Sequence, residues 1–229
     1  MLRLFFKKDN VSLFVEIINK IVVLNKDAFQ IEIKNFCSNE LKFSVGESYE
    51  LFIHIEIEDL LRDFYEVELI EVLPLENSCL LKFIHLNDVE IYQMLHYNIL
   101  IDWEKGNKID WRDLSSIDEK EAWLLACFKW SGIYLGKLKA SEFSLNFEDI
   151  ESVVDFYCLL GETLFGYRGY IGMDMMGFDD CIQYIYKANN NHSTKLILKN
   201  YRKLEFLNFH MEILKRFGFK ISLPPLPQE

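Results

Sequence analysis

Short alternating segments dominate roughly the first hundred residues of this 229-residue chain and constrain its fold most strongly. In the segment YELFIHIEIE (49–58), isoleucines alternate with histidine and glutamate. Apolar side chains at every second position are typical of a β-strand that buries one face and exposes the other. We predict strands over five ranges: 29–36, 49–58, 65–73, 79–86 and 97–103. Turn-forming residues between them, such as Gly46 and Pro74, favour a mainly antiparallel sheet or a small barrel.

A helix is predicted after this region, beginning at a capping box. Ser116 is followed three residues later by Glu119, a spacing in which each side chain accepts a hydrogen bond from the other residue's backbone N–H. Gly132 marks the expected end of this helix. All four tryptophans lie close to or within it, at positions 103, 111, 123 and 130. We assign them to packing rather than to a ligand-stacking platform.

The pattern changes from about residue 139 onward. A short strand is predicted over 142–147, a helix follows within 147–165, and a second helix begins after Asp174. Further along the chain, strands over 195–200 and 219–223 flank a helix over 203–218. This order favours an α/β unit with a small parallel sheet covered by helices. We therefore expect two domains, a β-rich α+β domain over residues 1–138 and an α/β domain over residues 139–229.

Composition narrows the possible roles of the chain. The formal net charge is −11, which disfavours binding to nucleic acid and to anionic membranes. The five cysteines are scattered singly, so we expect buried free thiols rather than disulfides or a zinc site, and no metal or cofactor. The sequence holds no apolar run of transmembrane length, and its start, MLRLFFKKDN, lacks a signal-peptide pattern. These features predict a cytoplasmic protein.

Charge is distributed unevenly along the second half of the chain. Residues 142–180 contain nine acids and one base, which gives −8, whereas residues 181–229 contain three acids and eight bases, which gives +5. An acidic segment of this kind is either a solvated face or a surface that steers a basic protein partner during association. Both interpretations are open at the level of sequence.

The segment YRGYIGMDMMGFDDCIQYI (167–185) joins a glycine-rich turn to the start of a helix. Asp174 is the expected N-cap, because its carboxylate can accept backbone N–H bonds at the positive end of the helix dipole. Gly169 and Gly172 permit a tight turn or the close approach of a partner's backbone. We predict an exposed edge that carries Tyr170, Asp174, Met176 and Asp180.

Helical spacing divides the residues after Asp174 into two faces. One face carries Met175, Phe178, Cys181, Ile182 and Ile185, and the opposite, exposed face carries Met176, Asp180, Gln183 and Lys187. Cys181 therefore belongs to the expected core and is not expected to act as a nucleophile.

The run FEDIESVVDFYCLLGETLFGYRGYIGMDMMGFDDCI (147–182) resembles the barstar family of ribonuclease inhibitors. In that family a helix leads to a tyrosine-glycine turn and then to a helix with an aspartate-cysteine pair. Here these features are Asp155-Phe156-Tyr157, Gly169-Tyr170, Gly172 and Asp180-Cys181. The resemblance extends more loosely to the strands predicted at 195–200 and 219–223, so it covers roughly the last ninety residues. It implies a barstar-like fold for residues 139–229.

The resemblance also implies a function, which is inhibition by occupation of an active site. Barstar-like proteins present this helix and turn to the basic active site of a secreted ribonuclease, where carboxylates replace the substrate phosphate. Asp180 matches the family's chief acid, Tyr170 and Gly172 match its turn, and Asp174 matches its N-cap. The family commonly has a second acid one helical turn before the chief one, and Met176 replaces it here. The predicted partner-binding residues are Tyr170, Gly172, Asp174, Met176, Asp179, Asp180 and Gln183.

Two other classes of function compete with this one. An enzyme would need a catalytic group, and the candidates are His54 with Glu56 or the adjacent Asp179 and Asp180. Adjacent aspartates on a helix point about 100° apart and do not share a proton. We therefore do not expect an enzyme. The alternative function is a non-enzymatic regulatory or structural module that binds another protein through the β-rich N-terminal domain.

Our hypothesis from the sequence is a cytoplasmic inhibitor or immunity protein. It would bind and block a basic toxin of the ribonuclease type through the acidic helix and the Tyr-Gly turn. The sequence indicates neither the oligomeric state nor the role of residues 1–138.

Overall fold

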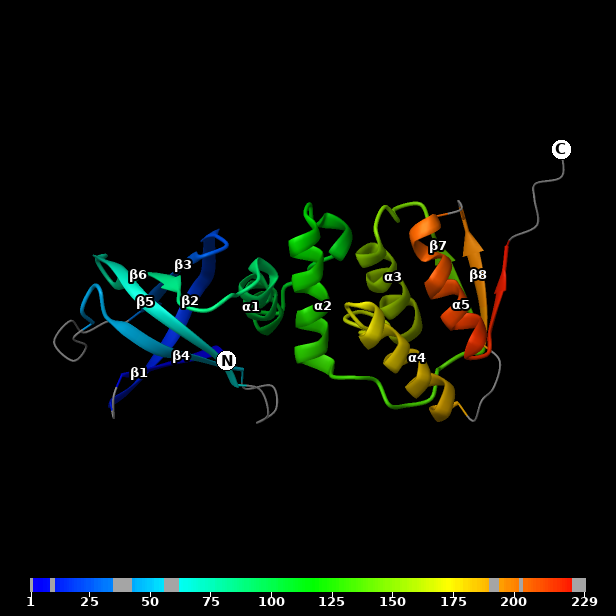
Figure 1. Ribbon diagram of the computed structural model, residues 1–229, viewed down its shortest axis with the longest axis horizontal. Coiled ribbons are helices and arrows are strands. Elements are labelled where there is room, and N and C mark those ends of the chain that lie inside the picture. The colour runs from blue at the N-terminus through cyan, green and yellow to red at the C-terminus, as the bar shows by residue number, and fades with distance from the viewer. Residues whose placement is uncertain are drawn as a thin grey trace. The chain divides into compact units, whose positions relative to one another are not determined.

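A computed structural model describes residues 2–8, 11–34, 43–55, 62–189, 194–201 and 204–223 of the chain. The chain divides into two compact units, Met1–Ile109 and Asp110–Glu229 (Figure 1). The boundary expected from the sequence, between residues 138 and 139, lies farther along the chain. The helix that follows the capping box is grouped with the second unit because it packs against another helix of that unit.

The first unit is built around a closed barrel of six antiparallel strands (Figure 1). Neighbouring strands pair in the order β1-β2-β3-β6-β5-β4, and β4 pairs back onto β1. Because every strand has two neighbours, the barrel has no free edge. The strands are β1 (Leu2–Lys8), β2 (Val11–Asn25), β3 (Ala28–Lys34), β4 (Ser48–Ile55), β5 (Arg62–Pro74) and β6 (Ser78–His85).

Alternate side chains of these strands fill the barrel interior. Phe83 stacks on Phe6 and on Phe29, with ring centroids 5.4 Å apart in both pairs, and all three rings are buried. Aliphatic residues of four strands complete this core: Ile31, Ile33, Leu51, Ile53, Val67, Leu69 and Leu81. The alternation seen in the sequence therefore corresponds to side chains inside and outside the barrel.

Four of the predicted strands correspond to β3, β4, β5 and β6, whereas β1 and β2 were not predicted. The long strand β2 contains a register shift between Ile17 and Ile21 in its pairing with β3. A bulge of this kind interrupts the two-residue period, and that period is the signal by which a strand is recognised in a sequence. The expected class, α+β with antiparallel strands in the first part of the chain, is confirmed.

The fifth predicted strand, over residues 97–103, is wrong because these residues form a helix. Helix α1 (Ile91–Glu104) begins at a capping box made by Glu90 and Gln93. Its buried residues include Met94, Tyr97 and Ile101, which recur at the three- and four-residue spacing of one helix face. The apolar run at 97–103 is the second half of that pattern.

Polar side chains fix α1 against the barrel. The Asn98 amide donates to the carbonyl of Ile21 on β2 and accepts from its N–H, both at 2.8 Å. The Tyr97 hydroxyl donates to Asp63 of β5 at 2.5 Å and lies 3.1 Å from the Tyr65 hydroxyl. Burial raises the pKa of Tyr97 well above its usual value, so its hydroxyl keeps its proton. These bonds satisfy groups that would otherwise be buried without partners.

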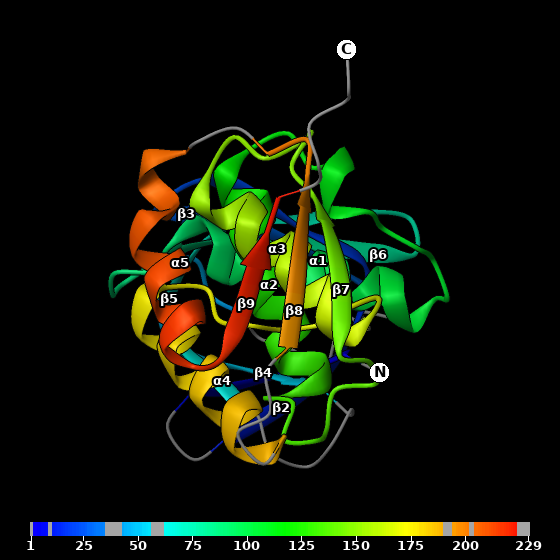
Figure 2. The same ribbon diagram turned by 90° about the vertical axis from the view of Figure 1, so that its right-hand side faces the viewer.

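The second unit contains a three-stranded parallel sheet with helices against one face (Figure 2). Its strands lie in the order β7-β8-β9, with β7 at Glu142–Asn146, β8 at Thr194–Lys199 and β9 at Phe219–Ser222. Its helices are α2 (Ile117–Ser131), α3 (Val153–Phe165), α4 (Met175–Ala188) and α5 (Asn208–Arg216). Two short 3₁₀ segments are η1 (Trp111–Asp113) and η2 (Glu205–Leu207). The predicted small parallel sheet covered by helices is confirmed.

Capping boxes start the two helices at the centre of this unit. Ser116 and Glu119 cap α2 as expected, and Ser152 and Asp155 cap α3 in the same way. The Asp155 carboxylate is buried and also accepts a hydrogen bond from Lys120 of α2 at 2.7 Å. One carboxylate therefore caps α3 and ties it to α2.

An aromatic cluster positions α4 within the unit. Phe178 of α4 packs against Tyr157 of α3 and His210 of α5, with ring centroids 5.5 Å and 5.2 Å away. The Tyr157 hydroxyl and His210 Nε2 are hydrogen-bonded at 2.7 Å. Because Phe178 is fully buried between two other helices, α4 has a fixed orientation and a fixed outer face.

Candidate protein-binding surface on helix α4

Two glycines hold the turn between α3 and α4 against α3. A Cβ atom at Gly161 would lie 2.4 Å from the carbonyl oxygen of Gly169, and a Cβ atom at Gly169 would lie 2.1 Å from the carbonyl oxygen of Gly161. Neither position accepts a side chain unless the backbone moves. Arg168 adopts a φ of 68°, and its guanidinium lies 4.3 Å from the ring centroid of Trp130. Backbone packing therefore fixes the path of this turn.

Gly172 allows a close approach within this chain. Its φ is 108°, and a Cβ atom there would lie 2.4 Å from the backbone nitrogen of Phe178. The sequence left open a tight turn or a close approach by the backbone of a partner, and the backbone that approaches is the first turn of this chain's own helix α4. Gly172 is buried, so it contributes to the surface only by allowing the start of α4 to pack against the turn.

Asp174 begins α4, as predicted. Its side chain is exposed and accepts a hydrogen bond from the backbone N–H of Gly177 at 2.7 Å. Met176, in the first turn, is 80% exposed, the highest value among the large hydrophobic residues of the described ranges. An exposed thioether next to a cap carboxylate gives this end of the helix an apolar contact and an anionic one.

The inner face of α4 agrees with the helical spacing. Phe178, Cys181, Ile182 and Ile185 are buried. Burial raises the pKa of the Cys181 thiol to about 12, and the nearby Asp180 carboxylate adds to this rise. The thiol is therefore protonated at neutral pH, and Cys181 is a core residue rather than a nucleophile.

The expected exposed position of Tyr170 is wrong. Its side chain is buried, and its ring lies 5.0 Å from that of Phe128 on α2. Burial raises the pKa of Tyr170 above its usual value, with smaller contributions from Cys181 and Asp174. The residue packs the turn onto α2 because Gly161 of α3 and Gly169 of the turn allow the backbone of the turn to lie close to the helices.

The adjacent acids of α4 have different surroundings. Asp179 accepts a hydrogen bond from Arg216 of α5 at 2.6 Å, so its charge is offset within the unit. Asp180 is exposed and has no hydrogen-bond or ion-pair partner among the residues that the structure describes. Gln183 accepts a hydrogen bond from Lys187 at 2.6 Å. Asp180 is therefore the acid of this pair that is available to a partner.

Two contributors to this surface were not predicted from the sequence. Tyr184 is about half exposed and lies one helical turn beyond Asp180. The i, i+4 spacing that selected Met176 and Asp180 also reaches Tyr184, so the local pattern contained this signal. Arg216 is different, because it reaches Asp179 from a helix 37 residues away and no local spacing indicates the pair.

Most acids of the segment 142–180 have partners within the second unit, and they do not form one acidic face. Glu142 pairs with Lys195 at 2.8 Å, and Glu162 pairs with Arg112 at 2.8 Å. Together with the Lys120–Asp155 and Asp179–Arg216 pairs, these contacts offset much of the −8 charge locally. The anionic character that remains on α4 comes from Asp174 and Asp180.

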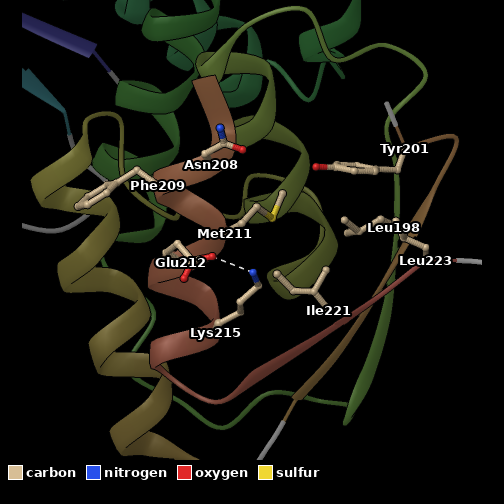
Figure 3. Close-up of a pocket in the computed structure, with 9 residues that line it drawn as sticks. All are labelled: Leu198, Tyr201, Asn208, Phe209, Met211, Glu212, Lys215, Ile221 and Leu223. Carbon is tan, nitrogen blue, oxygen red and sulfur yellow. Dashed lines mark hydrogen bonds and ion pairs between the residues drawn. The ribbon is translucent and has the colours of Figure 1, made fainter. Parts of the chain in front are cut away.

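A separate groove lies between α5 and the sheet (Figure 3). Its volume is about 580 Å³, and apolar side chains such as Met211 and Ile221 supply much of its lining. The polar groups at the groove include Glu212 and Lys215, which pair with each other at 2.8 Å (Figure 3). Its lining comes from β8, β9, α5 and the residues beside them, so no single sequence segment predicts it.

Other candidate chemistry has little support among the described residues. Within these ranges, no group of three or more His, Cys, Asp or Glu side chains could hold a metal ion. The structure describes the backbone of His54 but not its side chain, and Glu56 lies outside the described residues. No helix in the described ranges is long and apolar enough to cross a membrane.

Comparisons with known proteins add little to this geometry. No family model matches the chain, and no characterised protein matches it in sequence. Among solved structures, the inhibitor of motility MotI/DgrA from Bacillus subtilis matches with a TM-score of 0.30 and 14% identity. The match covers 45% of this chain and 48% of that protein, so it spans less than half of each. A likeness at this level supports no argument on fold or function, and the resemblance to the barstar family stays a prediction.

Proposed function

We propose that the second unit is a barstar-like inhibitor that binds and blocks a basic protein toxin of the ribonuclease type. The observation that carries this proposal is Asp180, an exposed carboxylate without an internal partner at the middle of a rigidly held helix. The resemblance to the barstar family also supports it, because that resemblance assigns Gly172 to the turn and Asp174 to the N-cap beside this helix. A protein of this kind acts in the cytoplasm of the cell that makes the toxin.

The exposed face of α4 defines the chemistry of the target. Met176, Asp180 and Tyr184 lie on successive turns, so one carboxylate is flanked by two large, largely apolar side chains. Lys187 follows, with its ammonium 6.0 Å from the centroid of the Tyr184 ring. A fitting target offers a groove with one cationic group opposite Asp180 and apolar surface on both sides of it.

Inhibition follows from this complementarity. The active site of a ribonuclease binds phosphate and is therefore a basic cleft. A carboxylate that enters such a cleft makes charge-assisted hydrogen bonds, which strengthen when water is excluded. The inhibitor then occupies the place of the substrate phosphate. Met176 replaces the second acid of the family, so we expect less dependence on charge and more on apolar contact.

The direct test begins with the genes on either side of the gene for this chain, because an immunity gene is expected beside the gene for a basic, ribonuclease-like toxin that it neutralises. The two proteins are co-expressed, and cell survival and cleavage of a labelled RNA are measured. We expect the wild-type chain to restore survival and block cleavage. Truncating one partner of a buried charge pair costs about 2–5 kcal/mol, so Asp180→Ala should weaken binding by at least about 30-fold.

Glu151 provides a matched control, because it is another exposed acid of the same segment and its side chain has no partner among the described residues. Glu151→Ala should leave affinity within about twofold, as expected for a charge at the rim. Equal losses for Asp180→Ala and Glu151→Ala would remove α4 as the binding surface. Failure of the wild-type chain to bind or inhibit the neighbouring toxin would overturn the proposed function itself.

A further inference from the structure

Helix α5 supplies a cation at one border of the exposed face of α4. Asp179 of α4 follows Met176 by three residues and precedes Gln183 by four, so its side chain is their neighbour on the helix surface. Arg216, in the last turn of α5, donates from Nη2 to Asp179 Oδ1 at 2.6 Å. The side chains of Arg216 and Asp179 are 59% and 35% exposed, so a partner bound to α4 can reach both.

The core of the second unit holds Arg216 in this place. Phe178 of α4 and His210 of α5 are buried with their ring centroids 5.2 Å apart, which fixes the two helices against each other. The Arg216 guanidinium lies 5.0 Å from the ring centroid of Phe217, and the dipole of α5 favours a cation in its last turn. The Asp179–Arg216 pair is therefore already formed on the surface that a partner meets.

The neighbouring base of α5 belongs to a different surface. Lys215 pairs with Glu212 at 2.8 Å, and both residues line the groove between α5 and the sheet (Figure 3). The two consecutive bases of α5 thus each pair with an acid, but the pair made by Arg216 borders the exposed face of α4. Lys215 is therefore a natural control for the charge of Arg216.

We propose that Arg216 determines the specificity of the α4 surface by neutralising Asp179. This inference rests on the proposed function and concerns the same surface. With Asp179 paired, Asp180 is the acid in the middle of α4 that remains available, and it fits a cleft with one cationic group opposite it. A cleft with a second cation at the position of Asp179 must set that cation against Arg216. Like charges set against each other across an interface suppress a wrong partner.

The sign of the expected effect follows from this arrangement. In Arg216→Gln, Asp179 and Asp180 both carry a charge that no base offsets, so the face attracts a basic partner more strongly. We expect the association rate constant to rise about threefold at low salt and to depend more steeply on salt, because a charge at the border of an interface acts mainly on association. A cleft that binds a polyanion carries several cations, so an unrelated basic ribonuclease should gain more affinity than the cognate toxin does.

Stopped-flow association of the full chain with the basic, ribonuclease-like protein encoded beside its gene tests this inference. Lys215→Gln removes the same charge on the groove side of α5, and its association rate constant should stay within about 1.5-fold of the wild-type value. Equal rate constants for the two variants, or slower association of Arg216→Gln, would overturn the proposal. Because damage to the fold does not speed association, a gain in Arg216→Gln has no explanation in a general loss of structure. An unchanged ratio of affinities for the cognate toxin and the unrelated ribonuclease would also overturn it.

A double-mutant cycle separates neutralisation from a direct contact between Arg216 and the target. Asp179→Asn alone leaves the cation of Arg216 without its acid, so this variant should associate about threefold more slowly at low salt. The double variant Asp179→Asn/Arg216→Gln removes both charges and should return close to the wild-type rate constant. If the double variant instead keeps the rate constant of either single variant, the two residues do not act as a pair. A wild-type chain that does not bind the neighbouring toxin would overturn the proposed function, whereas a wild-type chain that binds without these differences would overturn this inference alone.

Discussion

The barrel and the second unit expose their surface chemistry in different ways. In the barrel, every strand has two neighbours, and the contact between half-buried Phe52 and exposed Phe64 joins two different strands, β4 and β5. In the second unit, helices cover one face of a three-stranded sheet, and the exposed residues Met176, Asp180 and Tyr184 belong to the single helix α4 (Figure 2).

This difference determines what holds each surface in place. The Phe52–Phe64 pair of the barrel depends on strand register, because a slip of one residue would move a side chain to the opposite face of the sheet. The α4 surface depends on local features, namely the cap at Asp174, the close approach at Gly172 and the buried ring of Phe178. Local substitutions should therefore disturb the second unit strongly and leave the barrel intact.

The largest expected effect is that of Gly172→Ala. The added methyl group meets the backbone of Phe178 at a φ that disfavours side chains, so we expect a loss of about 3 kcal/mol in the unfolding free energy of the second unit. Urea unfolding with hydrogen exchange resolved by residue measures the two units separately. Barrel amides should keep their wild-type protection.

Two other glycines with positive φ are controls for this substitution. Gly166 in the second unit and Gly46 in the first have φ values of 87° and 84°, and a Cβ atom at either position meets open space. Their alanine variants should lose about 1–2 kcal/mol each, the cost of the backbone conformation alone. A similar loss for Gly172→Ala would show that the close approach to α4 does not hold the turn.

The next effect concerns the buried pair that ties α2 to α3. Lys120→Met leaves the buried Asp155 carboxylate without its cation, so we expect a loss of about 3 kcal/mol at pH 7. Lys215→Met is the control, because its pair with Glu212 is exposed and should contribute less than about 0.5 kcal/mol. Comparable losses in the two variants would contradict a special role for burial.

The pH dependence of the same pair has a defined sign. Burial favours a higher pKa for Asp155, but hydrogen bonds from Lys120, Ser152 and the backbone outweigh it and hold the pKa below the usual 3.8. A carboxyl group with a lowered pKa stabilises the fold above its unfolded-state pKa, and this stability is lost as the pH falls through the folded-state value. The difference between wild type and Lys120→Met should therefore shrink below about pH 4.

The comparison of the units also explains what the sequence could predict. Helical period and capping are local, so α2, α4 and the cap at Asp174 could be read from the residues themselves. The contact between Phe52 and Phe64 could not, because only the pairing of β4 with β5 brings these two rings together. The burial of Tyr170 and the Asp179–Arg216 pair were missed for the same reason, since both depend on contacts between distant segments.

The smallest expected effect is on the pH dependence of stability. Each unit contains a histidine whose pKa is lowered by burial, so the two units can be followed separately. Burial lowers the pKa of His85 in the barrel to about 4, despite the opposing influence of Asp27, and its ring stacks on Phe29 at 4.7 Å. Because protonation favours the unfolded chain, barrel stability should be complete above about pH 6.5 and should fall between that value and pH 4. His85 is partly exposed, so we expect a loss of only about 1 kcal/mol.

His210 in the second unit has a pKa that burial also lowers, although a hydrogen bond with the backbone of Phe206 opposes the shift. Its contribution to stability therefore has the same sign as that of His85 and falls as the pH decreases. His85→Gln should flatten the pH dependence of hydrogen exchange only in the barrel, and His210→Gln should do so only in the second unit. If either variant changed the pH dependence of both units equally, the two units would unfold as one cooperative body, and the local effects expected at Gly172 and Lys120 would reach the barrel as well.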